Sequence, residues 1–403
     1  TKQAVYIKLE RAELCFQLRF RRVFCFKNWR KRIPLCVLIG FFYRFDVFFE
    51  KKCQSKPEAL PHGVNEERSA ITFCAEKYDK FLLVINCGSA IDMAFAEEIP
   101  GINAILYLCQ LGMECGHAFA DVISGAVTPS GKLSDTWARK YVDIPFANEY
   151  SYLNGNLEEE FYKEGIYVGY RYFDSFGVEP AYPFGFGLSY TDFTIRSAGI
   201  AAEGSRITAK ASVTNSGSTY AGREVVQLYV SAPNGKLHKE YQSLAAFEKT
   251  NILAPGAAET VELNFDLKSL ASYREDDASY VLEAGNYILR LGNSSRKTMV
   301  IGVLSLDQEI VVSRHCHVCP VQAPLDELKS QPYAFEKAAE GLPRLFLEAS
   351  AIETVEYTYE TPEICQDEAV QTFLNTLSLE EMVDIVVGIG MFGGETRFNL
   401  PGS

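Results

Sequence analysis

The spacing of apolar residues divides the chain into a first part with alternating helix and strand signals and a later part dominated by strands. Residues 69–78 carry apolar side chains at helical intervals, and residues 80–86 form the short continuous apolar run that is typical of a parallel strand covered on both faces. The strand signal returns at residues 104–109, and residues 112–124 have the pattern of a helix. This alternation predicts an α/β domain with a mostly parallel sheet.

The pattern changes to period two after residue 193. Residues 206–213 alternate apolar and polar side chains, and residues 224–230 form the next strand candidate after a turn. Further strand candidates, each bounded by turn residues, lie at residues 259–267, 279–282 and 286–291. Strands at this spacing within about 95 residues predict a small all-β sandwich.

The remaining C-terminal residues show two other patterns. Residues 297–366 are mixed in character and rich in Glu and Pro, so we expect an extended linker with little core of its own. Residues 368–387 form an amphipathic helical region, in which Ser378 and Glu381 have the spacing of a capping box.

Charge and composition exclude some functions. The chain has 403 residues, of which 47% are hydrophobic, and a formal net charge of −13, which would repel the phosphates of nucleic acid. A neutral ligand such as a sugar suits this charge. Residues 1–60 differ from the rest, with 14 Lys and Arg against 5 Asp and Glu.

The eleven cysteines and the N-terminal region bear on the compartment. The cysteines are odd in number, scattered and often inside apolar runs, which favours free thiols in a reducing cytoplasm over a disulfide framework. We expect no cleavable signal peptide, and the apolar run at residues 35–43 is far shorter than the roughly 20 residues that span a bilayer. For residues 16–50 two interpretations stay open: contact with a membrane surface, or a leader without a specified fold.

The chain is richest in glycine and aromatic residues between residues 131 and 190. Three segments carry this composition, and they are Gly131-Lys132-Leu133 with Thr136-Trp137, residues 162–174, and residues 182–190. Aromatic rings and glycines together offer stacking faces and close backbone approach, as a sugar-binding wall requires. Composition alone leaves an aromatic core patch equally open.

The order of these segments resembles the α/β second domain of glycoside hydrolase family 3, the family of β-glucosidases and β-xylosidases. Asn215 and residues 221–222, 227–230, 270–273 and 282–287 resemble the fibronectin type III-like module that follows that domain. The C-terminal stretch resembles the entrance to the family's (β/α)8 barrel, in the order of members whose barrel comes last. The resemblance implies five regions: a basic unassigned leader (1–63), the α/β domain (64–192), the fibronectin type III-like sandwich (200–301), a linker (302–367) and the truncated start of the barrel (368–403).

The resemblance also implies an activity. Family members hydrolyse terminal β-D-glucosides or related β-glycosides with retention, without cofactor or metal, so the expected partner is a β-linked oligosaccharide or aryl glucoside. Their nucleophilic aspartate lies late in the barrel and their acid/base glutamate lies in a glycine-flanked loop. Glu50 and Glu58 precede the first strand signal but lack such glycines. We therefore assign no catalytic or substrate-binding residue, and we expect the chain to be inactive by itself.

Several motifs imitate functional sites. Ser134-Asp135-Thr136-Trp137 resembles the nucleophile motif of the family, but it lies inside a structural segment of the second domain, so we do not assign Asp135 as nucleophile. Residues 125–132 have the wrong spacing for a phosphate loop, and Leu133 replaces the Ser or Thr that would bind magnesium.

Three further candidates have ordinary interpretations. His315, Cys316, His317 and Cys319 cluster tightly, but only Cys365 follows, so we expect no metal site. Asn293 begins a glycosylation sequon, which matters only in a secreted chain. Glu114 lies where a helix begins and is expected to stabilise its dipole, with a role through neighbours of an active site as the alternative.

Two other functional hypotheses remain beside the hydrolase. The aromatic segments could form a non-catalytic carbohydrate-binding or interaction module. A nucleotide-binding α/β protein has only the parallel-strand pattern in its favour and lacks a glycine-rich phosphate loop. If the α/β domain normally meets a barrel, an uncovered apolar surface predicts self-association of this chain.

Overall fold

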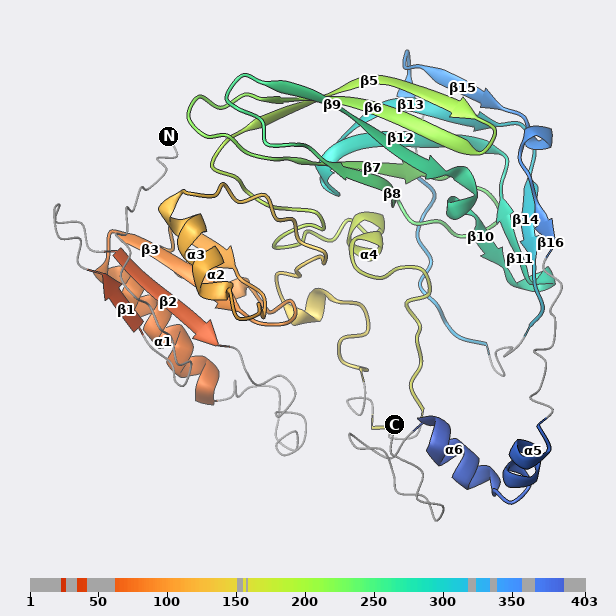
Figure 1. Cartoon of the computed structure of the whole chain (residues 1–403), viewed down its shortest axis with the longest axis horizontal. Coiled ribbons are helices and arrows are strands. Elements are labelled where there is room, and N and C mark those ends of the chain that lie inside the picture. The colour runs from red at the N-terminus through yellow and green to blue at the C-terminus, as the bar shows by residue number, and fades with distance from the viewer. Residues whose placement is uncertain are drawn as a thin grey trace. The chain divides into compact units, whose positions relative to one another are not determined.

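The computed structural model describes residues 23–26, 35–41, 62–150, 155–156, 159–317, 324–333, 339–356 and 367–387 (Figure 1). The chain divides into two compact units, Thr1–Glu356 and Tyr357–Ser403. The first unit holds an α/β part followed by β-sheets, and the second holds two short helices.

The α/β part is built on a four-stranded sheet in the order β1–β2–β3–β4. Its strands are β1 (Val23–Phe26), β2 (Leu35–Phe41), β3 (Lys80–Asn86) and β4 (Ala104–Tyr107). The β2–β3 and β3–β4 pairs are parallel, and β1–β2 is antiparallel. Side chains on both faces of β3 are buried, which confirms the doubly covered parallel strand predicted at residues 80–86.

The strands β1 and β2 belong to the segment for which the sequence analysis expected a leader without a fold. The β2 backbone pairs in parallel register with β3 along its whole length, from Leu35 opposite Lys80 to Phe41 opposite Asn86. A buried central strand needs hydrogen-bonding partners on both edges, and the apolar run of β2 supplies the second edge of β3. The apolar run at residues 35–43 thus contributes a sheet strand.

Helices pack against this sheet (Figure 1). They are α1 (His62–Lys77), α2 (Ala94–Glu98) and α3 (Cys115–Ser124). Ile71 and Cys74 of α1 share one buried core with Phe81 and Leu83 of β3. The helix predicted at residues 112–124 begins three residues later than expected and ends at Gly125, whose φ of 76° gives the left-handed cap that glycine favours.

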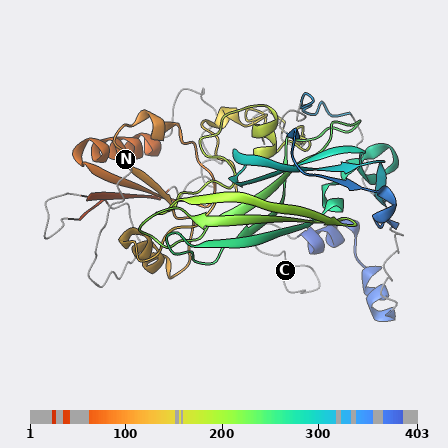
Figure 2. The ribbon, with the colours of Figure 1, turned by 90° about the horizontal axis from the view of Figure 1, so that it is seen from above.

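Two packed sheets form the β-sandwich (Figures 1 and 2). One has the order β5–β6–β9 and the other β15–β13–β12–β7–β8. Their strands are β5 (Phe193–Glu203), β6 (Arg206–Asn215), β7 (Val225–Ser231), β8 (Ser243–Lys249), β9 (Ala258–Asp266), β12 (Gly285–Ser294), β13 (Lys297–Leu306) and β15 (Arg344–Leu347). Alternate side chains of β6 and β9 meet those of β7 and β12 in the main core. The predicted sandwich is confirmed, although its strands β5, β8, β13 and β15 were missed.

A smaller sheet in the order β10–β11–β14–β16 lies beside the sandwich. Its strands are β10 (Ser272–Arg274), β11 (Ser279–Leu282), β14 (Ile310–Arg314) and β16 (Val355–Glu356). The strand predicted at residues 279–282 has the same bounds as β11.

The expectation of a linker over residues 302–367 is wrong for much of that range. Half of β13, together with β14, β15 and β16, comes from it, and Leu304, Leu306, Ile310 and Leu347 are buried in the sandwich core. A two-residue connection joins β12 to β13 as an antiparallel hairpin, without the Asn-Gly or Asp-Gly pair that signals such turns. Composition indicated a linker because the Glu and Pro residues lie between the strands.

The second unit contains α5 (Glu368–Leu374) and α6 (Leu379–Val387). Asp367 caps α5 by accepting hydrogen bonds from the backbone N–H groups of Ala369 and Val370, at 2.9 and 3.2 Å. Ser378 and Glu381 exchange the two hydrogen bonds of a capping box at the start of α6, as predicted. Among the helices in the described part of the chain, none has the length and apolar character to cross a bilayer.

Candidate functional site

Two of the glycine-rich and aromatic segments pair with each other in a short antiparallel ladder. The Leu133 N–H donates to the Phe186 carbonyl and the Trp137 N–H donates to the Tyr182 carbonyl, each at 2.9 Å. A Cβ at Gly187 would collide with the backbone carbonyl of the opposite segment, so this close approach requires glycine. The sequence segments that carried the family resemblance therefore meet in space.

The third segment forms α4 (Tyr170–Ser175), whose first residue is anchored on both the ladder and the sandwich. The Tyr170 ring lies 4.7 Å from the Phe184 ring and 5.9 Å, edge-on, from the Tyr229 ring, measured between centroids. The Tyr170 hydroxyl also accepts a hydrogen bond of 2.9 Å from the Leu244 N–H of β8. These contacts fix the N-terminal end of α4.

The other end of α4 is held by an ion pair between a buried carboxylate and a half-buried arginine. The Asp174 carboxylate, 3% exposed, lies 2.6 Å from Nε of Arg296 and accepts a hydrogen bond of 2.9 Å from the Gln242 amide. Arg296 also donates to the carbonyls of Phe173 and Val178, at 2.8 and 2.7 Å. Burial raises the pKa of Asp174, and the contacts with Gln242 and Arg296 oppose that rise.

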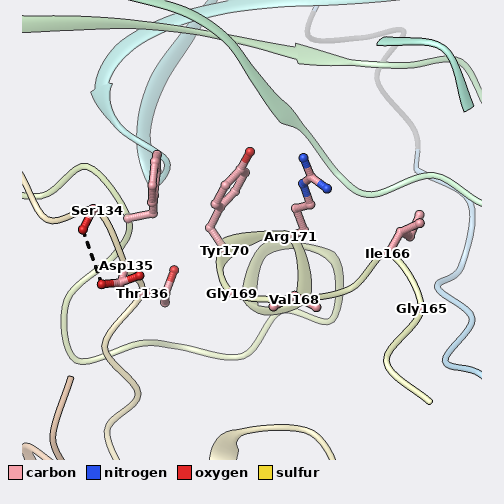
Figure 3. A pocket seen from close by; sticks show the side chains of 10 residues that line it. Ser134, Asp135, Thr136, Gly165, Ile166, Val168, Gly169, Tyr170 and Arg171 are labelled. Carbon is pink, nitrogen blue, oxygen red and sulfur yellow. Dashed lines mark hydrogen bonds between the residues drawn. The ribbon is translucent and has the colours of Figure 1, made fainter. Parts of the chain in front are cut away.

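A pocket of about 420 Å³ lies between the first segment and the residues that lead into α4 (Figure 3). It is lined by Ser134, Asp135, Thr136, Gly165, Ile166, Val168, Gly169, Tyr170, Arg171 and Phe184. In Figure 3, Asp135 and Thr136 come from one side, and Tyr170 and Arg171 rise from α4 on the other. The pocket thus brings together residues from all three of the segments that the sequence analysis singled out.

The pocket offers one carboxylate and one guanidinium. The Asp135 side chain is exposed and accepts a long hydrogen bond of 3.4 Å from the Ser134 hydroxyl. Nε of Arg171 lies 3.8 Å from the Glu240 carboxylate. Such groups can hydrogen-bond the hydroxyls of a sugar, but a retaining glycosidase needs two carboxyl groups about 5 to 5.5 Å apart. Asp135 is the single carboxylate among the lining residues, and its exclusion as nucleophile stays a prediction.

Some aromatic residues of these segments belong to the core, whereas others are half-buried, among them Tyr170 and Phe184 of the pocket lining. Trp137, Tyr167 and Phe173 are 3%, 1% and 3% exposed, so their ring faces are already covered. The Trp137 ring, for example, meets the Tyr107 ring edge-on at 4.9 Å. Composition could not separate the two interpretations because both use the same residue types. Tyr162, 76% exposed, remains accessible.

The pocket wall is also held by a segment within the expected linker. The Leu328 N–H donates to the Lys163 carbonyl at 3.0 Å, and the Ser330 N–H donates to the Tyr167 hydroxyl at 3.3 Å. Sequence reasoning missed these residues, and it missed Arg296 and Gln242 as well. Their partners lie far away along the chain, so no local pattern could have indicated them.

Glu114 is the N-cap residue of α3, which confirms that a helix begins there. Its carboxylate lies 2.6 Å from Nδ1 of His117 and raises the pKa of that imidazole, chiefly through this hydrogen bond. Both side chains are exposed, and neither residue belongs to the pocket lining. The contact favours the structural interpretation of Glu114.

The remaining sequence candidates do not converge on a site. His315, Cys316 and His317 are exposed after β14, and within the described ranges no three His, Cys, Asp or Glu residues are grouped as metal ligands. Cys319, Cys365, Glu50 and Glu58 lie outside the described residues. In the sequon, the Asn293 amide donates a hydrogen bond of 2.9 Å to Glu224, whose carboxylate also pairs with Lys132 at 2.8 Å.

Comparison with known families and structures agrees with this architecture. Residues 55–170 match the glycosyl hydrolase family 3 C-terminal domain, and residues 224–295 match the fibronectin type III-like domain. The two matched regions fall on the α/β part and on the sandwich. The chain therefore carries a domain similar to the C-terminal domain of glycosyl hydrolase family 3, followed by a fibronectin type III-like domain.

The relatives are β-glucosidases. The chain is 36% identical over 272 residues to a β-glucosidase of Ruminococcus albus, covering 66% of this chain and 28% of the relative. It is 34% identical over 298 residues to β-glucosidase A of Butyrivibrio fibrisolvens, covering 66% of this chain and 35% of the relative. The chain thus spans about a third of the length of these relatives.

Solved structures of β-glucosidases are also similar to this chain, and the chain again spans only part of each. β-Glucosidase 3B of Thermotoga neapolitana, solved in complex with glucose, shares 37% identity at a TM-score of 0.57, covering 61% of this chain and 34% of that one. A β-glucosidase of Paenibacillus barengoltzii shares 31% identity at a TM-score of 0.59, covering 81% of this chain and 38% of the other.

Proposed function

We propose that these domains belong to an enzyme that hydrolyses terminal β-D-glucosides or related β-glycosides with retention of configuration. The observation that carries the proposal is the assembly of the three family segments around one pocket, next to the sandwich that β-glucosidase relatives share. The net charge of −13 suits a neutral substrate. The expected ligand is a β-linked oligosaccharide or an aryl glucoside.

In this proposal the pocket forms one side of a sugar site. Asp135 would accept hydrogen bonds from sugar hydroxyls and Arg171 would donate them, because both lie in the lining. Retaining hydrolysis needs a nucleophilic carboxylate and a general acid, and the lining has a single carboxylate. The catalytic pair would therefore be supplied from outside this pocket lining, and the chain by itself would not turn over substrate.

A chromogenic aryl β-glucoside tests this proposal directly. We expect no release of the aryl alcohol above background from the chain alone. Turnover that Asp135→Asn abolishes and that Asp192→Asn retains would overturn our placement of the nucleophile. Asp192 is a suitable control because its side chain is exposed and absent from the pocket lining.

A carbohydrate-binding module without catalysis is the second candidate, because the pocket exists within this chain. Calorimetry with glucose and cellobiose separates the two candidates. A dissociation constant of about 1 mM or lower for either sugar favours the binding module. For the hydrolase we expect weaker binding, because the pocket is open on one side.

We also propose that the chain self-associates. Large apolar side chains are exposed along residues 141–168, among them Val142, Tyr162 and Val168. Size-exclusion chromatography over a hundredfold dilution should show an apparent mass that falls with concentration. A single monomer peak at every concentration would contradict this.

A cytoplasmic location is our proposal for the compartment. Cys87 is buried as a thiol outside any disulfide, as cysteines are in reducing surroundings. Fractionation of the source cells with antibody detection would test it.

A further inference from the structure

Two cysteines follow neighbouring parallel strands at the same level. Ile85 and Tyr107 are paired in the β3–β4 register, and the Leu108 N–H donates to the Ile85 carbonyl at 2.8 Å, so the pairing continues beyond β4. Two positions further along each strand lie Cys87 and Cys109. Adjacent strands are about 4.8 Å apart, which lies within the Cα separation of about 4.4 to 6.8 Å that disulfides use.

Two further observations place the segments after the strands in contact. A Cβ at Gly88 would lie 3.2 Å from Oε1 of Gln110, the residue after the second cysteine. Burial raises the pKa of Tyr107, and a hydrogen bond with the Cys109 thiol and the charges of Cys109 and Cys87 raise it further. The Cys109 thiol therefore lies within hydrogen-bonding reach of the Tyr107 hydroxyl, and the charge of Cys87 acts on the same group.

The two thiols differ in access. Cys109 is partly exposed, and its φ of 59° is a strained left-handed conformation for a residue with a side chain. Cys87 is 3% exposed, its thiol donates to the Ser89 carbonyl at 2.9 Å, and burial raises its pKa. An oxidant in solution thus meets Cys109 first, with Cys87 behind it.

We propose that Cys87 and Cys109 form a reversible disulfide on exposure to a hydroperoxide. The Cys109 thiolate attacks the peroxide, which breaks the O–O bond and gives a sulfenic acid and an alcohol or water. The Cys87 thiolate then attacks that sulfur, the S–S bond forms, and hydroxide leaves as water. Two thiols lose two electrons and two protons, and one peroxide is reduced. The proposal is independent of the glycosidase activity.

We test the disulfide proposal by treating the full chain with peroxide. The remaining thiols are then alkylated, and the peptides are analysed by mass spectrometry. We expect a linked pair of peptides containing Cys87 and Cys109, two hydrogens lighter than the reduced pair and released by dithiothreitol. The yield at fixed time should rise with pH above neutrality, because the pKa of Cys87 is raised and its thiolate is the second nucleophile.

Cysteine variants test which two thiols form the disulfide. Cys109→Ser should reduce the linked peptide to background, whereas Cys115→Ser, which removes another partly buried thiol nearby in sequence, should leave it unchanged. Cys109→Ala serves as a second variant, and thermal unfolding shows whether each variant folds. Linkage of Cys109 to Cys115 or Cys74, or oxidation of Cys109 to sulfinic acid without any link, would overturn the proposal.

Discussion

Glu283 shows how a single buried side chain can hold a loop on the sandwich. Its carboxylate lies 2.6 Å from Nζ of Lys239, both side chains are 6% exposed, and the Lys236 N–H donates to it at 2.5 Å. Burial acts to raise the pKa of Glu283, but Lys239 and the backbone N–H groups outweigh it and hold the pKa below 4.5. A carboxyl group with a lowered pKa in the folded state stabilises above its unfolded pKa and loses this stabilisation in acid.

We predict that Glu283→Gln lowers the free energy of unfolding at pH 7 by about 3 kcal/mol, because Lys239 stays buried without its partner charge. The variant should also lose less stability than the wild type as the pH falls below 4.5. Denaturant unfolding from pH 3 to 7 measures both effects. Glu248→Gln, which removes an exposed carboxylate on β8, is the control. Parallel pH profiles for wild type and Glu283→Gln would contradict the prediction.

At the scale of elements, α4 depends on its neighbours. Its six residues are too few for a stable isolated helix, since the cost of nucleation is recovered only over roughly 12 residues or more. Arg296, on the β12–β13 turn, ties the C-terminal end of α4 to the sandwich through Asp174. The conformation of the pocket wall is therefore determined by a hairpin more than a hundred residues away.

We predict that Arg296→Ala lowers the free energy of unfolding by about 3 kcal/mol or more, because Asp174 remains buried without a cationic partner. Hydrogen exchange of the α4 amides should become at least about tenfold faster, since 1.4 kcal/mol of local stability is a factor of ten. Arg314→Ala is the control, because Arg314 is half exposed and solvent screens its ion pair with Asp277. Unchanged exchange in α4 would show that the ion pair does not hold the helix.

At the scale of the whole first unit, the sandwich needs strands well beyond the expected boundary at residue 301. Leu304, Leu306 and Leu347 are buried in its core, and β15 extends the five-stranded sheet beside β13. The core therefore includes residues that the composition assigned to a linker.

We predict that a chain of residues 1–301 lacks cooperative unfolding, whereas a chain of residues 1–356 retains it. Loss of several buried leucines removes about 2 to 5 kcal/mol each, which exceeds the stability of a typical domain. Near-ultraviolet circular dichroism and thermal unfolding measure the difference. A sharp transition in the shorter chain would show that the sandwich is complete without these strands.

Several elements could be predicted because their residues form patterns that are local in the sequence. The continuous apolar run of β3, the alternation in β6, and the Ser378 and Glu381 capping box each define an element within a few positions. The strand β13 was missed because its apolar run follows a two-residue turn that carries no glycine signal. The functions of Asp174 and Arg296 were missed because their ion pair spans 122 positions of the sequence.

The sequence by itself determined the classes of the α/β part and the sandwich and the three segments around the pocket, because hydrophobic periodicity and short motifs are local properties. Only the tertiary structure decided which aromatic rings are buried, which carboxylate enters the pocket, and which distant strands complete the sandwich. Burial and ion pairing depend on contacts between residues far apart in the chain, such as Asp174 with Arg296 or Trp137 with Tyr107. No local pattern specifies such contacts, since the same residue types serve equally as core or as surface.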